Sequence, residues 1–177
     1  MKIFVCCSAR NEIPKKYLDS SANLLDNIFK YDNDLIFGAD DTGIMKIAYD
    51  NAKKHKRVVY GVCPKNYKDD LNRLACDCEI ISDDAIKRAK DAINLSDVVL
   101  ILPGGIGTYT ELFIALEAKR NHEYYGPIII YNETKFFDDL LKIINKMYKE
   151  GFILNNKEPL FYIANNIESC LKYLTNY

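Results

Sequence analysis

The segment DVVLILPGGIGTYTELFIALEAKR, residues 97–120, carries the strongest structural signal in the sequence. It begins with an uninterrupted apolar run, passes through a turn rich in glycine, and continues with apolar residues at helical spacing. An apolar run without alternation is typical of a strand that is covered on both faces, as in a parallel sheet. The segment therefore predicts a strand, a loop and a helix in direct succession.

Similar apolar runs recur along the whole chain and alternate with segments of helical period. They begin at Ile3, Leu35, Arg57, Cys78, Asp97, Pro127 and Leu160. This alternation predicts a doubly wound, mainly parallel α/β sheet of about seven strands, Rossmann-like, with helices on both faces. No linker or internal repeat divides the 177 residues, so we expect a single domain over residues 1–177.

Composition excludes several classes of protein. The 24 basic and 25 acidic residues leave a net charge of −1, so the chain has no bulk attraction for a nucleic acid polymer or an anionic membrane. No apolar stretch reaches the ~18 residues of a membrane span, and the first residues lack a signal-peptide pattern, so we expect a cytoplasmic protein. The six cysteines contain no CxxC pair, so we expect core or surface thiols and no metal site.

The glycine-rich loop is the first candidate site. It contains Gly104, Gly105, Ile106, Gly107 and Thr108, between the predicted strand and helix. Ligands of doubly wound sheets bind at the carboxyl ends of strands, and free amides at a helix N-terminus suit a phosphate. Because no lysine follows the last glycine and the GxGxxG spacing is absent, the loop favours a mononucleotide phosphate over Walker-type or dinucleotide binding.

Local interpretations compete with the functional one. Thr108 and Glu111 have the spacing of a capping box, in which Glu111 would only cap the helix. Arg88 lies at the edge of an apolar stripe on a helix predicted over residues 82–94, and it could instead pair with Asp84 one turn earlier. The stripe consists of Ala85, Ile86, Ala89, Ala92 and Ile93. A glycine-rich turn before a helix is also common connective structure.

The run from Pro103 to Glu111 resembles the PGGxGTxxE signature of the Lonely Guy (LOG) family, many of whose members are labelled possible lysine decarboxylases. Arg88 lies fifteen residues before Pro103, as the arginine of that family does. Residues 151–153 are similar to the GFI segment of the family. A loop that resembles its GGGSxGLM sequence contains Gly38, Gly43, Ile44 and Met45.

The resemblance implies hydrolysis of the N-glycosidic bond of a nucleoside 5'-monophosphate, of the AMP or cytokinin nucleotide type, to free base and ribose 5-phosphate. Glu111 could stabilise the oxocarbenium-like transition state or activate water, and Arg88 could hold the phosphate, so these two are the candidate catalytic residues. We expect no cofactor. No lysine follows the glycine loop until Lys119, which argues against a pyridoxal phosphate site and therefore against lysine decarboxylation.

Several positions depart from the family pattern. Residues 38–41 read Gly-Ala-Asp-Asp instead of three glycines and a serine, residues 6–9 read Cys-Cys-Ser-Ala instead of CGSS, and Ala89 replaces a lysine. Asp40 and Asp41 could bind ribose hydroxyls, hold a divalent cation or form an ordinary turn. The candidates for a substrate loop are Ser8, Gly38, Asp40, Asp41, Gly43 and Met45.

The alternative function is a non-catalytic carrier of a nucleotide or nucleotide-like cofactor, which needs the glycine loop but no carboxylate behind it. Transfer of the sugar to another base is a third hypothesis. We expect a small-molecule nucleotide as partner, no nucleic acid polymer, no membrane, and a homodimer, as in family members of this length. Apolar residues in support of a dimer are Leu112, Phe113, Leu116, Tyr124 and Tyr125.

Overall fold

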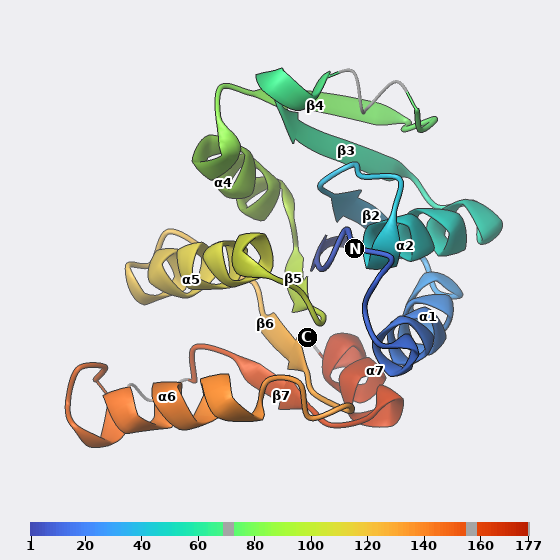
Figure 1. The fold of residues 1–177 in the computed structure, drawn as a ribbon. Helices are drawn as coiled ribbons and strands as arrows, with labels where there is room; N and C mark the ends of the chain where they lie inside the picture. The colour runs from blue at the N-terminus through green and yellow to red at the C-terminus, as the bar shows by residue number, and fades with distance from the viewer. Residues whose placement is uncertain (69–72, 155–158, 177) are drawn as a thin grey trace.

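The computed structural model describes residues 1–68, 73–154 and 159–176. Its seven strands form one sheet in the order β4-β3-β2-β1-β5-β6-β7, and every neighbouring pair is parallel (Figure 1). Each strand overlaps one predicted apolar run, so the predicted doubly wound parallel sheet is confirmed. The strands are β1 (Lys2–Cys6), β2 (Asp34–Phe37), β3 (Val59–Pro64), β4 (Cys78–Ser82), β5 (Val98–Ile101), β6 (Ile128–Tyr131) and β7 (Tyr162–Ala164).

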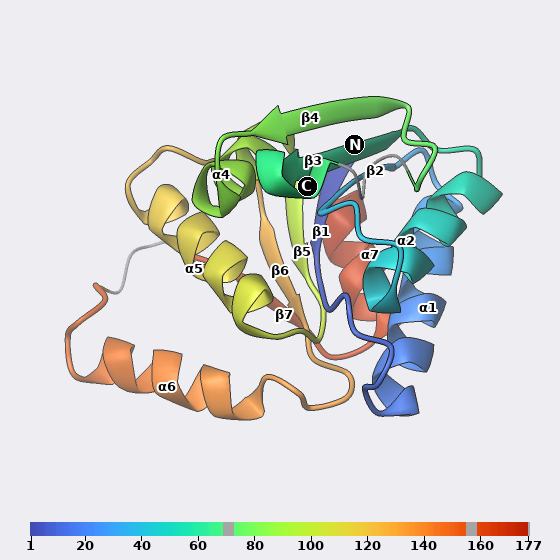
Figure 2. The same cartoon turned by 45° about the horizontal axis from the view of Figure 1, so that its top comes forward.

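Helices cover both faces of the sheet (Figures 1 and 2). One face carries α1 (Lys15–Phe29), α2 (Gly43–Lys54) and α7 (Ile167–Thr175). The other carries α4 (Ala85–Leu95), α5 (Ile106–Arg120) and α6 (Asp138–Lys149), and a short 3₁₀ turn, η1 (Lys65–Tyr67), follows β3. Within the described ranges, no helix is long and apolar enough to span a bilayer.

The central strands supply side chains to two separate apolar cores. Along β1, Ile3 and Val5 pack beneath α1, α2 and α7, whereas Phe4 and Cys6 pack beneath α4, α5 and α6. Successive side chains of a strand point to opposite faces, so a strand between two helical layers must be apolar at every position. This requirement explains the uninterrupted runs in the sequence.

The strand order reverses between β1 and β5. The chain winds outward from β1 to β4 and then returns through α4 to β5, on the other side of β1. Cys6 pairs with Ile101 where these two strands end, and Leu102 donates a backbone hydrogen bond to Cys6 over 2.9 Å. Chains that leave such a switch point in opposite directions open a crevice at the carboxyl edge of the sheet.

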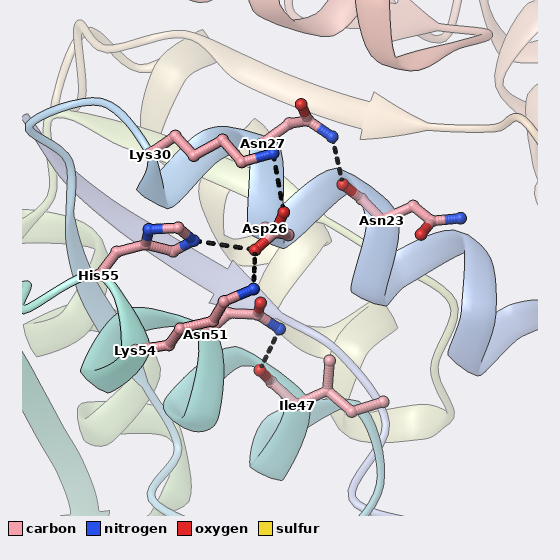
Figure 3. Close-up of polar contacts among 8 residues, drawn as sticks. All are labelled: Asn23, Asp26, Asn27, Lys30, Ile47, Asn51, Lys54 and His55. Atoms are coloured by element: carbon pink, nitrogen blue, oxygen red, sulfur yellow. Dashed lines mark hydrogen bonds and ion pairs between the residues drawn. The ribbon is translucent and has the colours of Figure 1, made fainter.

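An ion cluster joins α1 to α2 (Figure 3). The Asp26 carboxylate accepts hydrogen bonds from Lys54 at 2.7 Å and His55 at 2.8 Å, both at the end of α2, and pairs with Lys30 of its own helix at 2.9 Å. Lys54, followed by Lys30 and His55, holds the pKa of Asp26 well below its usual value. The cluster fixes the C-terminal ends of these helices against each other.

Candidate active site

The glycine loop presents backbone amides at the carboxyl end of β5. Gly105 forms the N-cap of α5 in an extended conformation, and Gly105, Ile106 and Gly107 are exposed. The first amides of a helix have no acceptor within it, so this end can receive an anion. A Cβ atom at Gly105 or Gly107 would meet no atom within 4 Å, which leaves the approach open.

Gly104 has a different role in the same loop. A Cβ atom there would lie 2.0 Å from Oγ1 of Thr108, whose side chain is buried in the space that the glycine leaves. Thr108 therefore packs against the loop as the third residue of α5, rather than capping it. The capping-box interpretation is wrong, because α5 begins three residues earlier than that interpretation requires and has no side-chain cap.

Glu111 and Arg88 form a buried ion pair between α5 and α4. Nη1 of Arg88 donates a hydrogen bond to Oε1 of Glu111, and their side chains are only 14% and 3% exposed. Burial raises the pKa of the Glu111 carboxyl, while the charge of Arg88 and its hydrogen bond oppose that rise. The structure thus brings together the two candidate catalytic residues, which are 23 positions apart in the sequence.

Asp84, the partner of Arg88 in the alternative interpretation, caps α4 instead. Asp84 is the N-cap of α4, and its Oδ1 accepts the backbone N–H groups of Ile86 and Lys87, each over 2.8 Å. The interpretation of Arg88 as a local partner of Asp84 is therefore wrong. The predicted apolar stripe is also shorter than expected, since Ala85 and Ile86, in the first turn of α4, are exposed.

Cys6 lies at the end of β1 and hydrogen-bonds the Glu111 carboxylate. Burial, and then the charge of Glu111, raises the pKa of this thiol well above its usual value, so the thiol stays protonated as a donor. Sequence reasoning missed this contact and treated all six cysteines as inert thiols. Its only sequence signal is the position of Cys6 where a central strand ends.

Ser8 joins the three loops that surround the crevice. Its backbone N–H donates to the carbonyl of Pro103 over 3.1 Å, and its carbonyl accepts the N–H of Ile44 over 2.9 Å and of Met45 over 3.3 Å. The buried hydroxyl accepts the N–H of Arg10 over 3.1 Å. This candidate substrate residue thus holds the β1 loop against the glycine loop and the start of α2.

Gly43 completes this junction. Its φ of +59° is a left-handed conformation, and a Cβ atom would lie 2.6 Å from the backbone nitrogen of Arg10. Glycine is therefore required at this close approach between the β1 loop and α2. Its own N–H donates to Oδ1 of Asn11 over 2.9 Å.

The two carboxylates after β2 have different surroundings. Oδ1 of Asp40 accepts the backbone N–H of Thr42 over 3.0 Å and its hydroxyl over 2.6 Å, which is a local turn. Asp41 instead faces the guanidinium of Arg73 at 4.0 Å. No cluster of three or more His, Cys, Asp or Glu side chains that could hold a metal ion occurs in the described parts of the chain.

A cavity of about 190 Å³ lies beside the ion pair, at the ends of β2 and β3. A Cβ atom at Gly38 would lie 3.5 Å from Nη1 of Arg88 and 3.1 Å from Cε of Met45, so this glycine lets both side chains approach. Arg88 borders the cavity and contacts Glu111, which connects the two. The lining residues are Gly38, Ala39, Asp40, Met45, Cys63, Pro64, Tyr67, Ala85 and Arg88.

A larger groove of about 910 Å³ runs along the outer side of α5. It includes Gly105 and Ile106 of the glycine loop and continues past Tyr109 and Phe113, but neither Arg88 nor Glu111 lines it. The GFI segment, residues 151–153, lies at another groove of about 320 Å³, between α5 and α6, where Phe152 is 77% exposed.

Comparison with known proteins adds family evidence. A family model described as "Possible lysine decarboxylase" matches residues 45–174. Two curated proteins of Arabidopsis thaliana, named cytokinin riboside 5'-monophosphate phosphoribohydrolases LOG2 and LOG4, are each 25% identical to the chain over 177 and 178 residues. These matches cover 99% of this chain and 83% and 82% of the two relatives.

Solved structures show the same fold. The molybdenum cofactor binding protein of Rippkaea orientalis has a TM-score of 0.71 and 24% identity, covering 99% of this chain and 95% of that one. The molybdenum cofactor carrier protein of Chlamydomonas reinhardtii has a TM-score of 0.69 and 19% identity, with 99% and 96% covered.

Proposed function

The chain belongs to the possible lysine decarboxylase family, the LOG family, and from this premise we propose that it hydrolyses the N-glycosidic bond of a nucleoside 5'-monophosphate. The products are the free base and ribose 5-phosphate. The names of the curated relatives support membership in a family of hydrolases. The observation that carries the proposal is the buried Arg88–Glu111 pair at the switch point of the sheet.

Stability alone does not explain why the Glu111 carboxylate is buried. Moving charges out of water is costly, and apolar residues of similar volume often replace a buried ion pair without loss of stability. A protein that only binds phosphate needs the amides of the glycine loop, not a carboxylate behind them. The position of Glu111 beside the crevice therefore favours a chemical role.

The proposed mechanism uses these groups in order. The amides of residues 105–108 bind the 5'-phosphate, which places the sugar over the Arg88–Glu111 pair. As the bond between C1' and the base nitrogen breaks, its electron pair leaves with the base, and the Glu111 carboxylate stabilises the positive charge on the sugar. Water attacks C1' and passes a proton to Glu111, which releases it to solvent, while the departing base takes up a proton from solvent water.

Arg88 has two roles in this reaction, one toward Glu111 and one toward the ligand. One of its N–H groups holds Glu111, which favours the charged carboxylate against the effect of burial. A guanidinium has five N–H donors, so others remain for the phosphate or the ribose. Lysine decarboxylation is disfavoured, because none of the described residues that line the 190 Å³ cavity is a lysine.

The deciding experiment incubates the purified protein with a panel of nucleoside 5'-monophosphates and measures released base by chromatography. Release of base that depends on Glu111 supports the hydrolase. Addition of a second free base distinguishes transfer from hydrolysis, since transfer yields a new nucleotide.

A carrier is the second candidate, favoured by the two structural neighbours that are named as molybdenum cofactor binding and carrier proteins. Such a protein would bind a nucleotide or nucleotide-like cofactor tightly and release no base. The same panel, followed by calorimetry, separates these outcomes.

We also propose a homodimer through the outer side of α5. Leu112 and Leu116 are buried against the sheet, as is Tyr124, so they add nothing to the surface. Ile106, however, is 89% exposed and Phe113 41%, both at the 910 Å³ groove. Exposed apolar side chains at a groove favour burial, and a second copy would provide it. Light scattering that gives 20.4 kDa throughout a dilution series would refute the dimer.

A further inference from the structure

The cavity beside Arg88 has the properties of a subsite for one part of a ligand. Its volume of about 190 Å³ is below the ~300–1,000 Å³ of pockets that hold a whole drug-sized molecule. Met45, Pro64, Tyr67 and Ala85 give it largely apolar walls, which suit a flat heteroaromatic ring.

The order of the strands tells which part of a nucleotide reaches the cavity. The glycine loop follows β5, the cavity lies at the ends of β2 and β3, and β1 stands between β5 and β2. A nucleotide with its phosphate on the loop and its sugar over Glu111 therefore extends its base across β1 toward the cavity.

Asp40 provides a specific acceptor in this subsite. Its Oδ1 already accepts two hydrogen bonds from Thr42, which fix the carboxylate in place. Its Oδ2 has no partner among the residues that the structure describes. An ionised carboxylate only accepts hydrogen bonds, so Oδ2 calls for an N–H donor on the ligand.

We propose that Asp40 determines base specificity, with its Oδ2 accepting a hydrogen bond from an amino group of the base. This inference rests on the proposed function, because it uses the nucleotide orientation given there. The preferred substrates are then nucleotides whose base carries an amino group with at least one N–H. Bases without a donor at that position leave the carboxylate without its partner, which weakens binding.

Two matched pairs of nucleotides test this inference. AMP and purine riboside 5'-monophosphate differ only in the amino group at C6, and GMP and IMP differ only in the amino group at C2. We would measure kcat/KM from released base, and Kd by calorimetry, for all four. In the parent protein, at least one pair should differ by about 10- to 100-fold in favour of the amino-bearing member.

The variant Asp40→Asn keeps the side-chain shape and an oxygen for Thr42, but it replaces Oδ2 with an NH₂ donor. It should reduce that ratio to within about threefold. Asp40→Gly, which installs the glycine of the family loop, removes the acceptor without adding a donor and should have the same effect. Asp50→Asn makes the same charge change on the exposed face of α2, where Asp50 pairs with Lys46, and should keep the parental ratio.

Each result supports or refutes the role of Asp40, the proposed hydrolase activity, or both. Equal values for both pairs in the parent, or an unchanged ratio in both Asp40 variants, would overturn the role of Asp40, even if base is released. Discrimination in Kd without release of base would support Asp40 as a specificity residue and refute the hydrolase. If none of the four nucleotides binds or reacts, both proposals fail.

Discussion

Replacing Glu111 with Gln removes the charge of the proposed catalytic carboxylate while keeping the size of the side chain. Truncating one partner of a buried ion pair typically costs ~3–5 kcal/mol. Two features of the structure reduce that cost here. The Gln carbonyl can still accept the hydrogen bond from Arg88, and the unfavourable burial of a carboxylate, which raises the pKa of Glu111, is relieved. We therefore expect a loss of about 1–2 kcal/mol in the free energy of unfolding.

The effect on turnover should be much larger than this loss can explain. A domain with ~5–15 kcal/mol of stability stays almost fully folded after losing 2 kcal/mol. Release of base should nevertheless fall by about 10²-fold or more, which corresponds to ~2.7 kcal/mol or more of transition-state stabilisation. Since burial raises the pKa of Glu111, the acid limb of the parental kcat/KM profile should lie above the usual carboxyl value of 4.5, and activity should fall as pH drops through it.

The assay combines chromatographic release of base with chemical unfolding of the same preparations. Glu150→Gln is the matched control, because Glu150 is a half-exposed residue that pairs with Lys146 at the end of α6. It should keep both parental stability and parental turnover. If Glu111→Gln unfolds as expected but releases base at the parental rate, Glu111 has no catalytic role and the mechanism is wrong.

Three further predictions address the glycine loop and the ion cluster that joins α1 to α2. Gly105→Asp should fold normally, because a Cβ atom there meets nothing, but calorimetry should no longer show tighter binding of a 5'-monophosphate than of its nucleoside. Gly104→Ala should lower the free energy of unfolding by ~1–3 kcal/mol, since the new methyl group collides with Thr108; a parental denaturation midpoint would contradict the packing described. Asp26→Asn should cost about 1 kcal/mol at pH 7. Because the pKa of Asp26 is lowered in the folded state, the stability difference between parent and variant should be fully present above pH ~4, the pKa of an aspartate in the unfolded chain, and should shrink as the pH falls below it. A stability difference that does not change with pH would exclude the ion cluster as its cause.

Much of the fold could be predicted because its signals are local. Uninterrupted apolar runs marked β1, β5 and β6, and the buried positions of these strands match them. The glycine loop was also visible, since a turn of this composition between an apolar run and a helical period has few alternatives.

The candidate site was harder to predict because it depends on contacts between distant segments. The spacing of Thr108 and Glu111 fits a capping box, but spacing cannot show that Gly105 takes the N-cap position. The partner of Arg88 is decided by the packing of α4 beside α5, which no local pattern encodes. The left-handed conformation of Ala39, with φ of +59°, is equally invisible, since alanine rarely adopts it.

The junction at Ser8 has a consequence for how freely these loops can change in sequence. The bonds from Ser8 to Pro103, Ile44 and Met45 all use its backbone groups. Any residue other than proline can make these bonds, so a change of the Ser8 side chain removes the hydroxyl bond to Arg10 but keeps the three loops joined. Ser8→Ala should therefore leave the crevice in place, whereas Gly43 tolerates no side chain.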